Sequence, residues 1–388
     1  MRVAYCVLHT RIGHCSRRGR RALRPLARDA RADDGGEQGR YRLQVETDSS
    51  DVRVPLTPAI SEEISQITGL PGLTGWRDLG GSWSTNIAAV PAPASGPLVF
   101  RIHQRFVDRH RLLAEQETRR ALAALGCPTV SALPLFQGST IGRLSSGNFV
   151  EAEPLVVSDA KMDTPDRLID GFAVLAALHN GLRTTPLLPA ARTVTYANHL
   201  DVELVADRTS AGLARIKSWR NTELTAFADR LATHLAGVAD SETRYLSDQQ
   251  RQVVHGDFWD NNVLFADGKV TAVLDFGFMA ERARIDDLAL PIWYHLLGQT
   301  ASASAPKETV ARMVDAYDEA SNHPLTIAER LQLPLVVARQ PAWLVGRWVL
   351  FEGDEAQAEV HARRAAAELH VAADVLDNLQ DWQEVLTR

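Results

Sequence analysis

Short stretches in the first half of the chain alternate apolar and polar residues with a period of two, which is typical of half-buried strands. The clearest one has Leu98, Phe100 and Ile102 on one face and Val99 and Arg101 on the other. In this geometry Val99 can pack against a nucleobase while Arg101 reaches phosphates, although an isolated Arg on an edge strand more often lies in water. The same reasoning predicts further strands at residues 73–79, 87–90, 133–136 and 149–152.

Apolar residues with helical spacing indicate helices in the remaining segments. In the segment 111–125, Glu115 falls on the same face as Leu112 and Leu122. An inward carboxylate is costly unless it is paired, so Arg101 is its expected partner, and Glu117 takes the role if the register is shifted. Other helices are predicted at residues 58–64, 166–182, 201–240, 286–290, 307–320, 327–350 and 356–385.

The change from strand-rich to helix-rich sequence near Glu153 predicts two lobes, because 388 residues exceed one ordinary core. We predict an α+β protein with a β-rich nucleotide-binding lobe at 53–152 and a mainly helical catalytic and substrate-binding lobe at 153–388. Residues 1–52 are Arg-rich without a regular period and are interpreted as a disordered extension. A basic tail that touches nucleic acid or membrane and a transit peptide remain alternatives for this segment.

Composition narrows the function. Hydrophobic residues make up 45% and charged residues 23% of the chain, as in soluble globular proteins. The net charge of -6 argues against a nucleic-acid partner, and no apolar run approaches the ~20 residues of a membrane span. Three cysteines without metal or disulfide spacing favour a reducing compartment, so we expect a cytoplasmic protein acting on small molecules.

The stretch 253–277 carries the candidate chemistry. Its apolar runs 263–265 and 270–274 flank a Gly-containing turn, which predicts a hairpin with Asp275 at the end of its second strand. Asp257 and Asn262 lie in the loop that enters the first strand. The hairpin therefore brings three oxygen-bearing side chains toward one point, and such ligands suit Mg²⁺.

A second candidate is the segment Gly80-Gly81-Ser82-Trp83-Ser84-Thr85-Asn86, which joins two predicted strands. Paired glycines beside small hydroxyl residues let backbone N–H groups approach a phosphate. Taken alone this signal is weak, since a Gly-Gly-Ser turn is usually only a hairpin. Neither a P-loop pattern nor a dinucleotide-binding glycine pattern occurs in the chain.

Residues 255–262 (HGDFWDNN), followed by Asp275-Phe276-Gly277 and by Asp287-Leu288-Ala289, resemble the signature of the aminoglycoside phosphotransferase family. That family is related to choline and homoserine-type kinases and shares the fold of protein kinases. The resemblance runs from about Leu73 to Ala289. It implies a protein-kinase-like two-lobe fold and ATP-dependent phosphorylation of a small-molecule hydroxyl.

The resemblance also implies a role for each matching residue. Asp257 would be the catalytic aspartate, and Asn262 and Asp275 would be the Mg²⁺ ligands. The loop over the phosphates would include Gly80, Gly81, Ser82 and Asn86. The remaining nucleotide contacts would come from Val99, the Arg101–Glu115 pair and the backbone of Val150 to Glu153. The family usually has Lys where Arg101 stands, and this departure puts the pairing with Glu115 in doubt.

Several residues keep two interpretations. Asp260, Glu281 and Asp286 could line an entrance that attracts a basic antibiotic or amino sugar, or could belong to a solvated face. Trp343, Trp348 and Trp382 could form a substrate wall or core. His255 is expected to order its loop, and His179 to be a core histidine. Alternatives to a kinase are a nucleotide-binding pseudokinase and a metal-dependent hydrolase; the oligomeric state stays undetermined.

Overall fold

The computed structural model describes residues 53–70, 72–81, 84–92, 96–193, 200, 202–298 and 306–388. The interpretation of residues 1–52 and the predicted phosphate contact of Ser82 lie outside the described residues. Within them, no helix is both long enough and apolar enough to cross a membrane.

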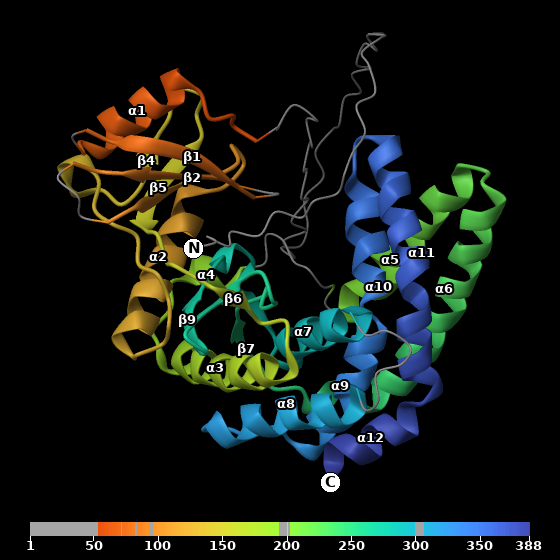
Figure 1. Cartoon of the computed structure of the whole chain (residues 1–388). Coiled ribbons are helices and arrows are strands. Elements are labelled where there is room, and N and C mark those ends of the chain that lie inside the picture. The colour runs from red at the N-terminus through yellow and green to blue at the C-terminus, as the bar shows by residue number, and fades with distance from the viewer. Residues whose placement is uncertain are drawn as a thin grey trace, which may run out of the picture.

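A five-stranded antiparallel sheet forms the first part of the fold, with the strand order β1-β2-β3-β5-β4. Its outer face packs on α1, and their shared core includes Ile64, Ile87, Phe100 and Ile102. Figure 1 shows α1 above the sheet and α2 below it. The elements are α1 (Pro58–Thr68), β1 (Thr74–Gly80), β2 (Thr85–Val90), β3 (Leu98–Ile102), α2 (Arg109–Ala124), β4 (Gly142–Arg143) and β5 (Phe149–Pro154).

The second part is mainly helical and contains two small sheets, β6-β8-β9 and β10-β7. Figure 1 places these sheets between the first sheet and the long helices α5, α6 and α11. In order the elements are β6 (Ala160–Lys161), α3 (Pro165–Thr184), α4 (Pro189–Arg192), α5 (Val202–Ser218), α6 (Thr222–Glu242), β7 (Arg251–Val254), β8 (Val263–Ala266), β9 (Lys269–Val273), β10 (Ala280–Ala283), α7 (Ile285–Gly298), α8 (Pro306–Ala320), α9 (Ile327–Ala338), α10 (Pro341–Trp343), a π-helical turn (Leu344–Val349), α11 (Glu355–Asp377) and α12 (Leu379–Thr387).

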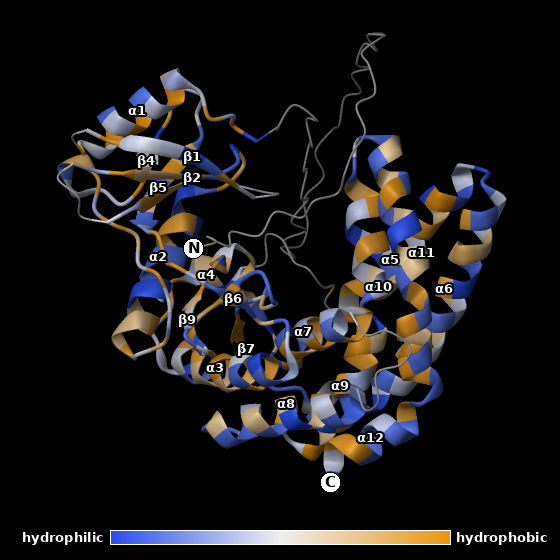
Figure 2. Cartoon of the chain, viewed as in Figure 1, coloured by the Kyte–Doolittle hydropathy of each residue, from blue (hydrophilic) through white to orange (hydrophobic). Residues whose placement is uncertain are grey.

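Local sequence explains where many helices begin. Thr57, Asp108 and Asn221 lie just before α1, α2 and α6, and their side-chain oxygens accept backbone N–H groups of the first turn. Thr326 and Glu329 form a capping box at the start of α9. Figure 2 shows hydrophobic and hydrophilic residues alternating along the helices, as expected for elements that bury one face.

The structure differs from several of the predicted elements. Residues 133–136 form no strand; Leu133 donates a single backbone hydrogen bond to Ala152, and a 3-10 turn follows at Phe136–Gly138. The helix predicted over 327–350 is interrupted, because Pro341 starts a new short helix that continues into the π-helical turn. The helical segments predicted at 201–240 and 356–385 are each divided into two helices, with breaks at residues 219–221 and at Asn378. The remaining predicted strands and helices are confirmed, with shifted ends.

Candidate functional site

The predicted hairpin at the centre of the site is confirmed. Strands β8 and β9 pair antiparallel, with Val263 opposite Val273. Asp267 and Gly268 connect them with φ of 51° and 72°, the left-handed conformations that tight hairpin turns require. Asp275 follows the second strand by two residues and itself has a φ of 63°. This uncommon conformation for a non-glycine residue marks the point where the chain leaves the hairpin.

Hydrogen bonds join the loop before β8 to the end of β9. The side-chain amide nitrogen of Asn262 donates to the Asp257 carboxylate at 2.7 Å and to the Asp257 backbone carbonyl at 2.8 Å. The backbone carbonyl of Asn262 accepts the N–H of Leu274, the residue before Asp275, at 2.8 Å. The hairpin therefore brings Asp257 and Asn262 into contact and places Asp275 next to their loop.

Arg101 connects this cluster with the first sheet. Its guanidinium lies 3.2 Å from the Asp275 carboxylate, which is 38% exposed. Asn86 lies opposite Arg101 across the β2–β3 pair, and its side chain donates to the carbonyl of Gly80 at 3.2 Å. The candidate phosphate-binding residues of the first sheet and the candidate metal ligand thus face the same region.

Gly81, between β1 and β2, has a backbone conformation that only glycine readily adopts. Gly81 has a φ of 116°, and a Cβ at this position would lie 2.3 Å from the carbonyl oxygen of Ser84. The N–H of Gly80 donates to the Asp78 carboxylate at 2.7 Å. A side chain at position 81 is therefore excluded both by conformation and by space.

Asp287, a buried carboxylate that sequence reasoning did not assign to the site, holds the loop that carries Asp257. Its oxygens accept the backbone N–H groups of His255 at 2.6 Å and Gly256 at 2.7 Å, and lie 3.1 Å from Nε2 of His179. Burial raises the pKa of Asp287, but the hydrogen bond and charge of His179 bring that pKa below its usual value. The sequence does contain a signal for this residue, because Asp287 belongs to the family signature quoted above.

His179 and His255 are structural, as expected. His179 is 2% exposed and lies 2.8 Å from the Tyr317 hydroxyl through Nδ1. His255 is fully buried; its Nε2 lies 2.9 Å from the Leu274 carbonyl and its Nδ1 accepts the Asp257 N–H at 3.2 Å. His255 therefore ties the Asp257 loop to the segment between the end of β9 and Asp275.

The buried state of His255 predicts a pH effect on folding. Burial lowers the pKa of His255 in the folded protein, and its Nδ1 can accept the Asp257 N–H only when unprotonated. Below the reference pKa of about 6.5 the unfolded chain binds a proton that the folded chain resists, so stability falls as the pH drops from there toward the lowered value. We expect His255→Gln to reduce this slope by up to about 1.4 kcal/mol per pH unit, as measured by urea unfolding between pH 5 and about pH 8. An unchanged slope in the variant would contradict this assignment.

The predicted pairing of Arg101 with Glu115 is wrong. Glu115 pairs with Arg111, one turn away on α2, at 2.8 Å, and burial raises its pKa. Among the described residues, Arg101 forms ion pairs with Asp275 and with Glu153, whose carboxylate lies 3.8 Å away. Because Arg111 occupies the helical position four residues before Glu115, the acid is neutralised locally and is not available to β3.

The acid beside Arg101 instead belongs to a charged network that the sequence did not reveal. Glu153 and Glu151, both on β5, bind the guanidinium of Arg119 at 2.7 Å and 2.6 Å. Glu151 also contacts His103 at 3.2 Å and Gln116 at 2.7 Å. Burial raises the pKa of Glu151, but the charge of Arg119 and the contact with His103 bring that pKa well below its usual value.

The Val150 to Glu153 segment, whose backbone is expected to hold the adenine, lies within β5. These residues pair with β3, with Val150 opposite Ile102 and Glu153 opposite Val99. The carbonyl of Ala152 in addition accepts the N–H of Leu133 at 2.7 Å. The adenine contact of this backbone stays a prediction, and the Glu153 side chain is a further candidate nucleotide contact.

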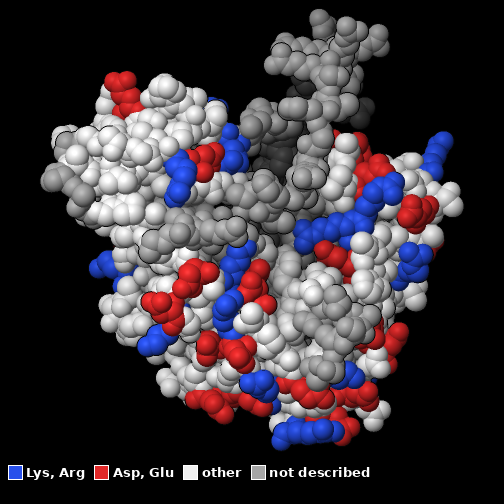
Figure 3. Space-filling view, in the orientation of Figure 1, with Lys and Arg blue, Asp and Glu red and all other residues white. Residues whose placement is uncertain are grey.

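Two of the three residues considered for an acidic entrance are engaged with basic side chains elsewhere. Asp286 is 1% exposed and binds Arg339 at 2.5 Å, so it is a buried structural acid. Glu281 pairs with Arg192 at 2.8 Å on the surface. Burial raises the pKa of the Asp260 carboxyl. Figure 3 shows acidic and basic side chains interspersed on the visible face, without a single acidic field.

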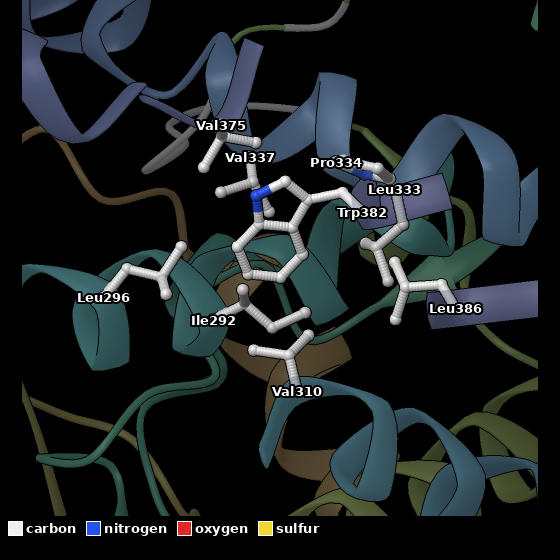
Figure 4. A pocket seen from close by; sticks show the side chains of 9 residues that line it. All are labelled: Ile292, Leu296, Val310, Leu333, Pro334, Val337, Val375, Trp382 and Leu386. Carbon is white, nitrogen blue, oxygen red and sulfur yellow. The ribbon is translucent and has the colours of Figure 1, made fainter. Parts of the chain in front are cut away.

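The tryptophans proposed as a substrate wall are largely core residues. Trp343 and Trp382 are 5% and 3% exposed, and Trp348 stacks on His361 with ring centroids 5.4 Å apart. Figure 4 shows the indole of Trp382 among aliphatic side chains, where it borders a cavity of about 10 Å³. Residues from α7, α8, α9, α11 and α12 line this cavity, which barely accommodates one water molecule and lies apart from the Asp257 loop.

Comparison with known proteins places these observations in a family. Residues 75–319 match the family model described as the phosphotransferase enzyme family, which covers more than half of the chain. A comparison with curated protein sequences gave no match.

Solved structures show the same fold. Amicoumacin kinase hAmiN, in complex with AMP-PNP, Ca²⁺ and Ami, aligns with a TM-score of 0.60 at 10% identity over 81% of this chain and 93% of its own. A microcompartment-associated aminopropanol kinase aligns with a TM-score of 0.63 at 14% identity over 85% and 99% of the two chains. Choline kinase from Cryptosporidium parvum Iowa II aligns with a TM-score of 0.56 at 9% identity over 84% of this chain and 100% of its own. These alignments confirm the predicted kinase-like fold.

Proposed function

The chain belongs to the phosphotransferase enzyme family, and from this membership we propose that it transfers the γ-phosphate of ATP to a hydroxyl group of a small molecule with the help of Mg²⁺. The observation that carries the proposal is the contact of Asp257 with Asn262 beside the end of the strand that delivers Asp275. We further propose that residues 53–152 form the nucleotide-binding lobe and residues 153–388 the catalytic and substrate-binding lobe. The cysteine content supports a cytoplasmic protein.

Asp257 is proposed to accept a hydrogen bond from the attacking hydroxyl. An aspartate with a reference pKa of ~3.9 is a feeble base for an alcohol, so its first task is to orient the nucleophile and its second is to take the proton late. Asn262 holds the carboxylate through its amide nitrogen, and Asp287 holds the loop. The site therefore positions the acceptor oxygen, which suits a transfer that depends mainly on alignment and charge neutralisation.

The residues present fit a Mg²⁺ ion that arrives with the nucleotide. Because Asn262 donates through its nitrogen, its Oδ1 remains for a metal, and Asp275 supplies a half-exposed carboxylate. No cluster of three or more His, Cys, Asp or Glu side chains able to hold a metal occurs in the described part of the chain. This suits Mg²⁺, which commonly uses one or two protein oxygens and completes its shell with phosphates and water. Bound there, the ion would neutralise charge on the phosphate oxygens.

Arg101 is proposed to bind the phosphates in place of the usual lysine. Its guanidinium already lies beside Asp275, and a planar fork can hold phosphate oxygens in a bidentate manner. Asp275 would serve as a metal ligand and Arg101 would have the phosphates as its anionic partner when nucleotide and Mg²⁺ are bound.

The acceptor is proposed to be an aminoglycoside, another basic antibiotic or a small metabolite. The names of the similar structures point to amicoumacin, aminopropanol and choline as acceptors of those enzymes. Asp286 is buried and Glu281 is paired with Arg192, so these two acids do not distinguish among the acceptor classes.

The test is an acceptor screen. The protein is incubated with ATP and Mg²⁺ and with aminoglycosides, tuberactinomycins, choline or homoserine, and products are read by a mass increase of one phosphoryl group with matching ADP release. A kinase gives both signals with at least one acceptor. Nucleotide binding without acceptor-dependent ADP release would favour a pseudokinase, and phosphate release from a substrate without ATP would favour a hydrolase.

A further inference from the structure

The inner face of the first sheet carries a small apolar surface that is separate from the core under α1. Leu79, Ala88 and Val99 form it, each no more than 8% exposed, and Leu155 packs against them. Their neighbours along the strands, such as Phe100, point to the opposite face and belong to the main core of this sheet. The sheet therefore has a second, inward apolar face.

Strand register places polar groups at defined positions around this apolar surface. Val99 lies opposite Ala88 on one side and Glu153 on the other, and residues opposite each other in an antiparallel sheet share a face. Arg101 is two residues farther along β3 on the same face, roughly 7 Å from Val99. A nucleotide whose phosphates bind Arg101 would thus lay its base against Val99, within reach of Glu153.

Glu153 has an unfilled hydrogen-bonding position in this location. Its side chain is 1% exposed, and one oxygen, Oε2, binds Arg119 at 2.7 Å. The other oxygen, Oε1, accepts no hydrogen bond, and its ion-pair contact with Arg101 is 3.8 Å long. A buried carboxylate oxygen without a donor is costly, so a ligand that brings an N–H group to this point gains affinity.

We infer that the Glu153 carboxylate selects adenine over guanine by accepting a hydrogen bond from the exocyclic amine of the base. This inference rests on the proposed function, because it needs a nucleotide in the cleft. Adenine carries an amine at position 6, which donates. Guanine and hypoxanthine carry a carbonyl at position 6. This carbonyl is also an acceptor, so neither it nor the Glu153 carboxylate oxygen would receive a hydrogen bond.

The experiment measures nucleotide affinity by calorimetry with the full-length chain, Mg²⁺ and non-hydrolysable analogues of ATP, GTP and ITP, so that no acceptor is needed. The wild-type protein should bind the ATP analogue about 10- to 100-fold more tightly than the ITP and GTP analogues, the range expected for one hydrogen bond to a charged group. Glu153→Gln should bring the ATP:ITP ratio close to one, because a glutamine amide can accept from an amine or donate to a carbonyl.

Glu151→Gln is the matched control. Glu151 is equally buried, binds the same Arg119 and lies on the same face of β5, but it is opposite Arg101 and not Val99. Its loss should weaken all three nucleotides alike and leave their ratio unchanged. A wild-type ratio near one, or a ratio that survives Glu153→Gln, would overturn the inference while the proposed function stands. Failure of every nucleotide to bind would instead reject the proposed function.

Discussion

Replacing Asp257 by Asn is expected to lower the rate of phosphotransfer about 100- to 10,000-fold, the range for loss of a positioned acid–base group. The carboxylate is 5% exposed and is fixed by the amide of Asn262, so the substitution removes charge and basicity with little change of shape. An asparagine can still accept the hydrogen bond from Asn262, which keeps the loop in place. The measurement is acceptor-dependent ADP release at saturating substrates.

The same variant should bind Mg-ATP almost as well as the wild-type protein, because Asp257 is assigned to the acceptor and not to the metal. Calorimetric titration with Mg-ATP checks this. Asp260→Asn is the matched control: Asp260 lies in the same loop without an assigned role and should retain most of the activity. Asp257→Asn with near-normal turnover, or with a large loss of Mg-ATP affinity, would remove Asp257 from its assigned role.

Replacing Asp275 by Asn is expected to weaken Mg-ATP binding at least about 10- to 100-fold, a loss already typical when a supporting partner of a metal ligand is removed. The substitution deletes the only carboxylate assigned to the metal. It also ends the ion pair with Arg101, so the guanidinium is left for phosphates. Binding of ATP without Mg²⁺ should therefore stay the same or improve, and calorimetry with and without Mg²⁺ separates the two effects.

Asp267→Asn serves as its control, because Asp267 lies at the far end of the same hairpin and is exposed. It should bind Mg-ATP normally. If Asp275→Asn weakened the metal-free and the Mg²⁺-bound nucleotide by the same factor, Asp275 would be a structural residue of the hairpin and not a metal ligand.

The features of the site that the sequence predicts correctly are those determined by the pattern of neighbouring residues. The Val263–Ala266 and Lys269–Val273 strands need only an apolar period and a turn, and the alternation in Leu98–Ile102 fixes which side Arg101 occupies. Each of these features is decided within a few residues. The family signature then added roles to positions that local pattern alone cannot assign.

The ion-pair predictions that are wrong concern residues with several possible partners that are distant in the sequence. Arg101 could pair with any nearby acid. Glu115 pairs with Arg111 on its own helix, whereas the pairing of β3 with β5 places Glu153 near Arg101. Asp286 and Asp287 are adjacent in sequence, yet Asp286 binds Arg339 and Asp287 holds the loop that carries Asp257. Which buried acid meets which cation is decided by tertiary packing, and a single sequence carries no period that reveals it.

The most direct test of the central claim is a crystal structure with Mn²⁺ and a non-hydrolysable ATP analogue, in which anomalous scattering locates the metal. The account predicts an ion within about 2.1 Å of Oδ1 of Asn262 and of the Asp275 carboxylate, bridging to the phosphates, with Asp257 facing the γ-phosphate from beside it. A metal bound without Asn262 and Asp275, or a nucleotide bound away from Arg101, would contradict it.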